Sequence, residues 1–301
     1  MDPPHITPGD APAVPTSAIK HALLVGGDSG LLTFLSGVLK PPAWETHQVA
    51  NNAEALAIAA KKQFDLIITD EKTAGYEDIE LLRKIRSVRP HTRLIILTGE
   101  GAPEDVIASM REHAFSYFSN PISRDELAAM VQIAAEEPCW DDGIEVVSAT
   151  PEWIRTLVRC DLKTADRLLQ FLNEISELPS DERRDVARAF REMLLNAIEY
   201  GGCLDPTKYV EIDYVRARHV VTCRIADPGP GFNLNEIPHS AIANPPGDPI
   251  KHMEVREELG MRPGGFGILL AQQLVDELIY GESGNEVFLV KYLDPHKPTA
   301  A

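Results

Sequence analysis

Short apolar runs alternate with helical patterns through the first half of the chain, and this alternation restricts the fold more than any other feature of the sequence. Runs of strand length occur at 22–25, 65–69 and 94–97, and each is followed by apolar residues spaced three and four apart. A strand pattern at 114–119 and a helix pattern at 125–135 complete the series. Alternating strands and helices predict an α/β domain with a parallel, doubly wound sheet.

The second half of the chain has a different pattern, in which strands follow one another through short turns. Runs of helices beside such strands predict an α+β sandwich with a mixed or antiparallel sheet. The predicted strands cover 144–148, 209–215, 220–226 and 286–292, and the predicted helices cover 152–175, 181–200 and 267–278.

The length of 301 residues fits two domains of about 150 residues each. The first segment is rich in proline and has almost no large apolar side chain. It therefore cannot bury enough apolar surface to compensate for the conformational entropy that folding would cost. A polar segment that contains proline and glycine follows the last predicted helix of the first half. We therefore expect tails at 1–18 and 295–301, an α/β domain over 19–138, a linker at 139–143 and an α+β domain over 144–294.

The chain carries 46 acidic and 29 basic residues, which gives a formal net charge of −17. Such a charge disfavours unspecific contact with nucleic-acid phosphates and with anionic lipid. No apolar run approaches the roughly 20 residues that span a bilayer, so we expect a cytoplasmic protein that binds neither membrane nor nucleic acid directly. The four cysteines form no CxxC pair, which favours buried thiols over a structural zinc site.

Glu192 and Asn196 lie four residues apart beside the apolar stripe of the predicted helix 181–200. Their carboxylate and amide groups therefore project side by side. Such a pair can orient a hydroxyl group and contribute oxygen ligands to Mg²⁺. Taken alone, the pair is more often a solvated helix edge.

Two glycine clusters favour a binding role for this pair over a solvated helix edge. Asp227 ends the predicted strand 220–226 and opens the cluster 227–231, where it can accept a hydrogen bond from an exocyclic amine such as that of adenine. The second cluster, 264–267, precedes a predicted helix, whose free backbone N–H groups and dipole favour phosphate. The order of the clusters predicts a nucleotide site.

Together these motifs resemble the N, G1 and G2 boxes of the GHKL superfamily, the histidine-kinase-like ATPases. Bacterial anti-sigma-factor serine/threonine kinases are the most similar members, on the segments REMLLNAIEYG (191–201), DPGPGF (227–232) and GGFGILLAQQLVDEL (264–278). The resemblance implies that Asn196 binds Mg²⁺ and that Glu192 is the base that activates a protein hydroxyl. It also implies that Asp227 contacts adenine and that the glycines surround the phosphates of ATP, namely Gly229, Gly231, Gly265 and Gly267.

The segment 233–262 resembles the mobile ATP lid of this superfamily. Lys251, Arg256 and Arg262 are its candidates for contact with the γ-phosphate, against the alternative of ordinary surface cations. Pro263 stands where many relatives have a first glycine, which is a small departure from the family pattern.

Histidine kinases are the enzymatic rival within the superfamily, but they need a phosphoacceptor histidine ahead of the ATP domain. Residues 139–190 contain no histidine, which disfavours this activity. The later histidines, His219, His239 and His252, are expected to be solvated at a strand start or in the loop.

The first domain resembles a response-regulator receiver, which has a flavodoxin-like fold. The resemblance rests on Asp70 after the strand 65–69, Thr98 after the strand 94–97 and Tyr117 on the strand 114–119. Parallel sheets bind their ligands at the carboxyl ends of their strands. The resemblance implies that Asp70 is the phosphoacceptor, Thr98 the switch hydroxyl and Tyr117 the switch aromatic.

Two departures from the receiver pattern affect its chemistry. Gly26 and Gly27 stand where receivers carry the acidic pair that holds Mg²⁺, with Asp28 one place further on, and Asn120 replaces a lysine. Without these cationic groups, phosphoryl transfer to Asp70 is electrostatically poor. We interpret the domain as a degenerate pseudo-receiver that docks a partner, dimerises or controls the second domain. The alternative, in which Asp28 serves the metal site, stays open.

The sequence therefore predicts a bacterial signalling regulator that binds ATP and Mg²⁺ under the control of a degenerate receiver. It is expected to phosphorylate a serine or threonine of an antagonist protein in partner switching, with that antagonist, a sigma factor, or both as its protein partners. The sequence leaves open whether the chain forms a homodimer, as members of both resembling families often do. One alternative is a non-catalytic adaptor gated by ATP. The other is a response regulator that is phosphorylated on Asp70.

Overall fold

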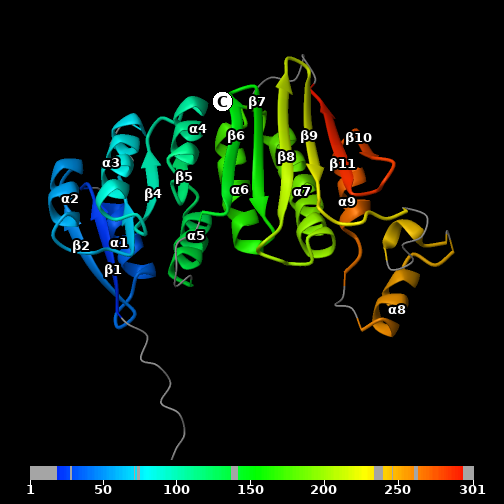
Figure 1. The fold of residues 1–301 in the computed structure, drawn as a ribbon, viewed down its shortest axis with the longest axis horizontal. Helices are drawn as coiled ribbons and strands as arrows, with labels where there is room; N and C mark the ends of the chain where they lie inside the picture. Colours follow the sequence, from blue (N-terminus) through cyan, green and yellow to red (C-terminus); the bar gives the residue numbers. More distant parts are fainter. Residues whose placement is uncertain are drawn as a thin grey trace, which may run out of the picture.

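A computed structural model of the chain shows two β-sheets side by side, each with its own helices (Figure 1). The expected tails at 1–18 and 295–301 lie outside the described residues, as do positions 139–141 of the expected linker. No helix of the described part is both long and apolar enough to cross a lipid bilayer. The structure describes residues 19–27, 29–70, 72, 75–136, 142–233, 240–245, 247–260 and 264–293.

The first sheet is parallel throughout, with strand order β2-β1-β3-β4-β5, which confirms the predicted α/β class. Successive strand residues point to opposite faces, so Leu23 packs with α2, α3 and α4 while Leu24 packs with α1 and α5. Its strands are β1 (Lys20–Val25), β2 (Trp44–Val49), β3 (Leu66–Ile68), β4 (Arg93–Thr98) and β5 (Ser116–Ser119), and its helices are α1 (Ser29–Val38), α2 (Asn52–Ala59), α3 (Gly75–Val88), α4 (Pro103–Arg111) and α5 (Arg124–Glu136).

The second sheet is antiparallel throughout, with strand order β10-β11-β9-β8-β7-β6, which confirms the predicted α+β class. Its strands are β6 (Ile144–Thr150), β7 (Trp153–Arg159), β8 (Tyr209–Ala217), β9 (Val220–Ala226), β10 (Glu277–Tyr280) and β11 (Glu286–Tyr292). The helical segments are α6 (Leu162–Ile175), α7 (Ser180–Asn196), the π-helical η1 (Ala197–Gly201), the 3₁₀ turn η3 (Ala241–Ala243), α8 (Lys251–Glu258) and α9 (Gly267–Leu274). The buried sides of α6, α7 and α9 pack on one face of this sheet.

Two expectations about individual elements were wrong, and two elements were not predicted at all. The predicted helix 152–175 begins only at Leu162, because 153–159 form β7, whose alternate residues are buried as in a strand. The predicted helix 267–278 ends at Leu274, and the chain then continues into β10. The first half also contains β2 and α2, which the sequence did not reveal since β2 is a largely exposed edge strand with few apolar residues.

Helix α6 of the second sheet lies against β5 and α4 of the first, so the two halves share a continuous hydrophobic core. Arg167 on α6 is only 3% exposed, and its guanidinium donates hydrogen bonds to the carbonyl oxygens of Ala114 (3.3 Å) and Phe115 (2.9 Å). It also pairs with the Asp142 carboxylate at 2.5 Å. This buried cation fixes α6 to the segment that leads into β5.

A second set of contacts joins α6 to the carboxyl end of β5. The Gln170 amide donates to the Tyr117 carbonyl oxygen at 3.0 Å, and the Ser119 backbone N–H donates to the Glu174 carboxylate at 3.0 Å. Burial raises the pKa of Glu174 to about 6, although the hydrogen bonds from Ser119 act in the opposite direction. The contact between the halves is therefore polar as well as apolar.

We expect Arg167→Ala to lower the free energy of unfolding by about 3–5 kcal/mol, because it removes the buried cation that pairs with the Asp142 carboxylate and leaves several carbonyl groups without this donor, while Asp142 keeps only its contact with the half-exposed His113. The matched control is Arg184→Ala, since Arg184 forms only an exposed pair with Asp181 and should change stability by about 0–1 kcal/mol. Urea denaturation of both variants measures the difference. Equal, small losses for the two variants would contradict the assigned role of Arg167.

The raised pKa of Glu174 predicts a pH dependence of stability. Between about pH 4.5, the ordinary pKa of such a group, and about pH 6 the folded carboxyl holds a proton that the unfolded one has lost. The folded state is therefore stabilised below this window and loses about 2 kcal/mol as the pH rises through it. Glu174→Gln should remove that loss, whereas the same change at the exposed Glu145 should not. Urea denaturation from pH 4 to pH 7 tests this, and a pH-independent difference between Glu174→Gln and wild type would refute it.

Candidate functional site

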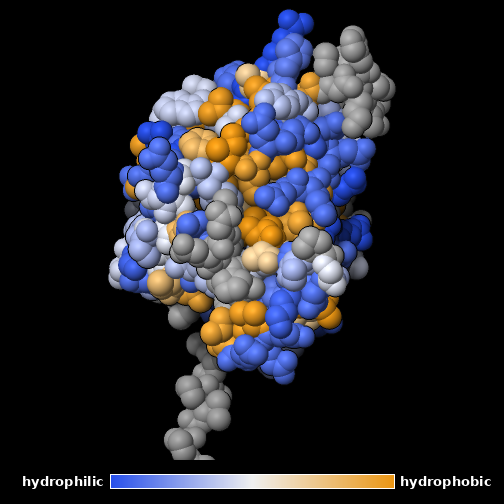
Figure 2. All heavy atoms as spheres, turned by 90° about the vertical axis from the view of Figure 1, so that its right-hand side faces the viewer, coloured by the Kyte–Doolittle hydropathy of each residue, from blue (hydrophilic) through white to orange (hydrophobic). Residues whose placement is uncertain are grey.

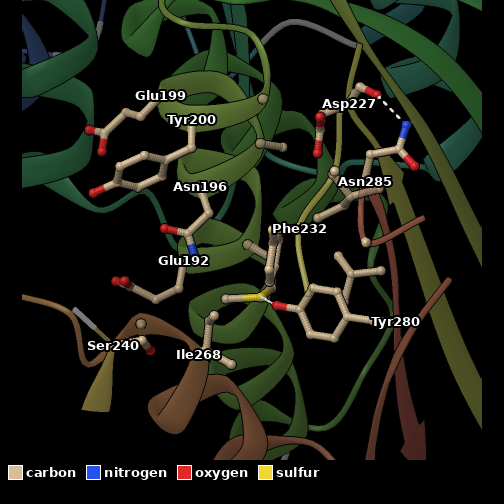
Figure 3. Close-up of a pocket in the computed structure, with 18 of the residues that line it drawn as sticks. Glu192, Asn196, Glu199, Tyr200, Asp227, Phe232, Ser240, Ile268, Tyr280 and Asn285 are labelled. Carbon is tan, nitrogen blue, oxygen red and sulfur yellow. Dashed lines mark hydrogen bonds between the residues drawn. The ribbon is translucent and has the colours of Figure 1, made fainter. Parts of the chain in front are cut away.

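A cavity of about 550 Å³ lies between α7, the start of α9 and the ends of β9 and β11 (Figure 3). Six of the seven residues selected from the three sequence motifs line it, and they come from three distant parts of the chain. The seventh, Gly229, lies in the turn beside Asp227, where an added Cβ would come within 2.8 Å of the Asp227 Oδ1 and of the Gly201 Cα. The six are Glu192, Asn196, Asp227, Gly231, Gly265 and Gly267.

Helix α7 carries Glu192 and Asn196 on the side that faces the cavity, as their labels in Figure 3 show. The neighbouring positions Ala189, Phe190 and Met193 are buried in the core, which fixes the rotation of the helix. The spacing of four residues therefore places a carboxylate and an amide in the same wall of the cavity, as the sequence predicted.

The start of α9 meets these two side chains. A Cβ added to Gly267, the first residue of α9, would lie 2.9 Å from the Glu192 Oε2 and 3.7 Å from the Asn196 Nδ2. Any larger residue at 267 would therefore displace the Glu192 carboxylate from this position. Gly264 and Gly265 have φ angles of +145° and +92° and line the cavity together with Phe266 and Gly267. Phe266 makes no side-chain cap with the described residues, and the first backbone N–H groups of a helix have no partner within the helix itself.

Asp227 closes the opposite end of the cavity. Its Oδ1 accepts a hydrogen bond from the Gly229 N–H at 2.8 Å, and burial raises the pKa of this carboxyl despite that bond. The Asn285 amide donates to the Asp227 carbonyl oxygen at 3.2 Å, the dashed line at upper right in Figure 3. At Gly201 an added Cβ would come within 2.1 Å of the Asp227 carboxylate.

Sequence reasoning gave no role to Gly201 or Asn285. Gly201 ends η1, five positions after Asn196, and only the fold reveals that Asp227 rests on it. Asn285 lies in the turn before β11, where nothing in the local sequence marks a site. These two residues support Asp227 from both sides.

The wall next to Asp227 is aromatic. The rings of Phe232 and Tyr280 meet edge to face with centroids 5.4 Å apart, and the Tyr280 hydroxyl donates to the Met193 sulfur at 3.4 Å. Burial raises the pKa of Tyr280, so this hydroxyl stays protonated at neutral pH. An apolar wall with one carboxylate at its end suits a flat heterocycle that carries an amine.

The described part of the expected lid contains α8. Arg256 is 4% exposed and lines the cavity, whereas Lys251 is about half exposed and pairs with Glu254.

The expectation of a solvated His252 was wrong, because this residue is fully buried. Its ring meets the Phe266 ring edge to face, with the ring centroids 4.5 Å apart. His239, Arg262 and Pro263 lie outside the described residues.

Asn244 explains the position of His252. Its side-chain oxygen accepts a hydrogen bond from the His252 backbone N–H at 2.8 Å, and its amide nitrogen lies 2.7 Å from the His252 Nδ1. Because an amide nitrogen only donates, the ring Nδ1 accepts this bond. The pair ties the start of α8 to the segment that packs on α9.

The Asp70 site of the first sheet is closed by its neighbours. Asp70 is 3% exposed, and its carboxylate accepts hydrogen bonds from the backbone N–H groups of Gly27 (2.9 Å) and Lys72 (3.0 Å). Gly26 has a φ of +113°, and a Cβ there would lie 2.2 Å from the Asp70 Cβ. A side chain at 26 therefore has no room beside Asp70. Asp28, the alternative metal ligand, lies outside the described residues.

Thr98 and Tyr117 lie near this end of the first sheet and are both buried. The Thr98 hydroxyl donates to the Glu100 carbonyl oxygen at 3.0 Å. Burial raises the pKa of Tyr117, so its hydroxyl stays protonated. Asn120, which replaces a lysine of the receiver pattern, is exposed just beyond β5.

Comparisons with known proteins assign both halves of the chain. The response regulator receiver domain family matches residues 22–132, and the histidine kinase-like ATPase domain family matches residues 158–291. This agrees with the motifs found in each half.

Two curated proteins are similar to the first half. The sporulation initiation phosphotransferase F of Bacillus subtilis (strain 168) is 30% identical over 110 residues, which are 36% of this chain and 89% of that protein. The transcriptional regulatory protein GlrR of Escherichia coli (strain K12) is 29% identical over 146 residues, which are 47% of this chain. The matched part spans only 33% of the length of GlrR. A solved CheY-like receiver from Methanospirillum hungatei JF-1 is 26% identical and covers 40% of this chain and 95% of its own, with a TM-score of 0.36.

Gly201→Ala should weaken the binding of a non-hydrolysable ATP analogue at least about tenfold, because the added methyl group displaces the Asp227 carboxylate. The matched control is Gly247→Ala, since a Cβ at Gly247 meets open space. Isothermal titration calorimetry on the full chain measures both. Wild-type affinity in Gly201→Ala would show that the position of the Asp227 carboxylate does not affect binding.

Proposed function

We propose that this chain, which belongs to the response regulator receiver family and carries a histidine kinase-like ATPase domain, binds ATP and phosphorylates a serine or threonine of a partner protein. One observation carries the proposal: Glu192 and Asn196 meet the first residue of α9, Gly267, in a single cavity. A carboxylate thus lies beside the helix terminus that suits phosphate.

ATP fits this cavity in one orientation. Asp227 accepts a hydrogen bond from the adenine amine, and Phe232 and Tyr280 form the apolar wall beside the base. The phosphates then extend toward the N–H groups at the start of α9 and toward the buried Arg256. Asn196 offers an amide oxygen of the kind that Mg²⁺ takes, and the ion would neutralise phosphate charge when bound.

In the proposed reaction Glu192 acts on the acceptor hydroxyl. Its carboxylate takes the proton as the serine or threonine oxygen bonds to the γ-phosphorus, and the bond from that phosphorus to the β–γ bridging oxygen breaks, which releases ADP. The protein contributes mainly by positioning the reactants and by stabilising phosphate charge, which is what phosphoryl transfer mostly requires. A carboxylate at this point favours transfer over a purely structural role for ATP.

The acceptor must be a protein that reaches the cavity. Apolar side chains are exposed among hydrophilic ones on this end of the molecule (Figure 2), and an exposed apolar patch is typical of a protein contact. Exposed apolar residues of the cavity wall and of α8 include Phe232, Phe266 and Met253. We propose a small antagonist protein as acceptor and a sigma factor as second partner, in keeping with the resemblance and with a net charge that disfavours nucleic acid.

The first domain is proposed to act on the second by contact. The absence of room at Gly26 supports a pseudo-receiver, and α6 contacts β5 through Arg167 and Gln170. Asp166 of α6 pairs in turn with Arg191 of α7 at 3.4 Å, directly beside Glu192. A shift of β5 would therefore move α6 and, through it, the helix that carries Glu192.

The decisive test compares wild type with Glu192→Gln in the presence of labelled ATP and a candidate antagonist protein. We expect transfer to fall at least about 100-fold while ATP affinity stays within a few fold, because a general base acts on the reaction more than on binding. Glu145→Gln, at an exposed position of β6, should keep full activity. Tight ATP binding without transfer by wild type to any cognate partner would favour the ATP-gated adaptor instead.

A further inference from the structure

Three metal-binding side chains meet at the amino ends of β1 and β2, at the opposite end of the first sheet from Asp70. They are His21 on β1 and Glu45 and His47 on β2, and their ligand atoms all lie within 4.8 Å of one another. This is the only such group found among the described residues. We propose that it binds a divalent transition-metal ion, with Zn²⁺ as the best match.

The separations fit a single ion. The Glu45 Oε1 lies 2.9 Å from the His47 Nε2, and the Glu45 Oε2 lies 3.4 Å from the His21 Nδ1. Ligand atoms at about 2.0–2.1 Å from a tetrahedral zinc are roughly 3.3 Å apart. Each oxygen of the Glu45 carboxylate thus lies close to one imidazole nitrogen, and an ion would bind between these groups.

A cation already lies next to this position. The Lys62 ammonium is 2.5 Å from the His47 Nε2 and 3.3 Å from the Glu45 Oε1. The tautomer of His47 with a bare Nε2 accepts a hydrogen bond from this ammonium, and that tautomer is also the form that ligates metal. Lys62 does not contact the third group: the His21 Nδ1 is buried, lies 3.4 Å from the Glu45 Oε2, and makes no hydrogen bond within the described part of the chain. A metal ion would bind all three groups.

The backbone holds the ligands in place before any ion arrives. His21 is directly opposite Glu45 in the parallel ladder, and the His21 N–H and carbonyl oxygen both hydrogen-bond to Asp65. The ring of the buried Phe64 meets the His47 ring edge to face at 5.6 Å. Such preorganisation lowers the entropy that binding must overcome.

The chemistry of the group favours zinc over Mg²⁺. Two imidazole nitrogens and one carboxylate, with water in the fourth position, form a common zinc ligand set, whereas Mg²⁺ prefers oxygen ligands only. The cysteine spacing that argued against zinc concerns thiolate sites and does not bear on this one. A bound ion would cross-link the edge strand β2 to β1.

The test titrates the full chain with Zn²⁺, without nucleotide, in competition with a chromophoric chelator. We expect one high-affinity site, at least about tenfold weaker in His21→Gln and in His47→Gln. Lys62→Met should bind zinc more tightly, because it removes the competing ammonium, while Lys61→Met, at the exposed neighbour, should match wild type. Melting curves in chelator verify that each variant folds.

Cobalt gives a second readout, because nitrogen and oxygen ligands lack the thiolate-to-metal charge-transfer band. A Co²⁺ complex without that band, lost in His47→Gln, supports the site. Zinc affinity unchanged by both histidine substitutions, or a thiolate band that points to the exposed Cys203, would overturn it.

Discussion

The structure depends most on one buried cation, the Arg167 guanidinium. Burying a charge is costly unless it is paired and hydrogen-bonded, and Arg167 satisfies both conditions only by reaching across to Ala114, Phe115 and Asp142. The requirement therefore fixes α6 against β5. Since α6 is also the first helix of the second sheet, neither half can shift without disturbing this contact.

From this contact the arrangement of the nucleotide site follows. Helix α6 packs on α7, α7 presents Glu192 and Asn196, and Gly267 brings the start of α9 against them. At the far end, Gly201 and Asn285 hold Asp227. In the proposed function, the backbone N–H groups at the start of α9 and the buried Arg256 supply the local positive field that an acidic molecule needs to bind an anion.

Much of this could be predicted from the sequence, because the motifs are local and ordered. The strand and helix periodicities gave both fold classes, and the glycine clusters placed Asp227 and Gly267 in one site. The features that could not be predicted from the sequence are those that depend on tertiary contacts. Gly201 and Asn285 act only through Asp227, β2 is an edge strand without an apolar pattern, and His252 is buried because Asn244 and Phe266 enclose it. The spacing of apolar residues along the sequence carries no information about such contacts.

The first domain is proposed to act on the ATP site through α6. Hydrogen–deuterium exchange on the full chain, with and without a non-hydrolysable ATP analogue and Mg²⁺, measures this coupling. We expect the nucleotide to change the protection of amides in β5 and α4 as well as in α6, α7 and α9. Changes confined to the residues of the second sheet and its own helices, with β5 and α4 unaffected, would contradict it.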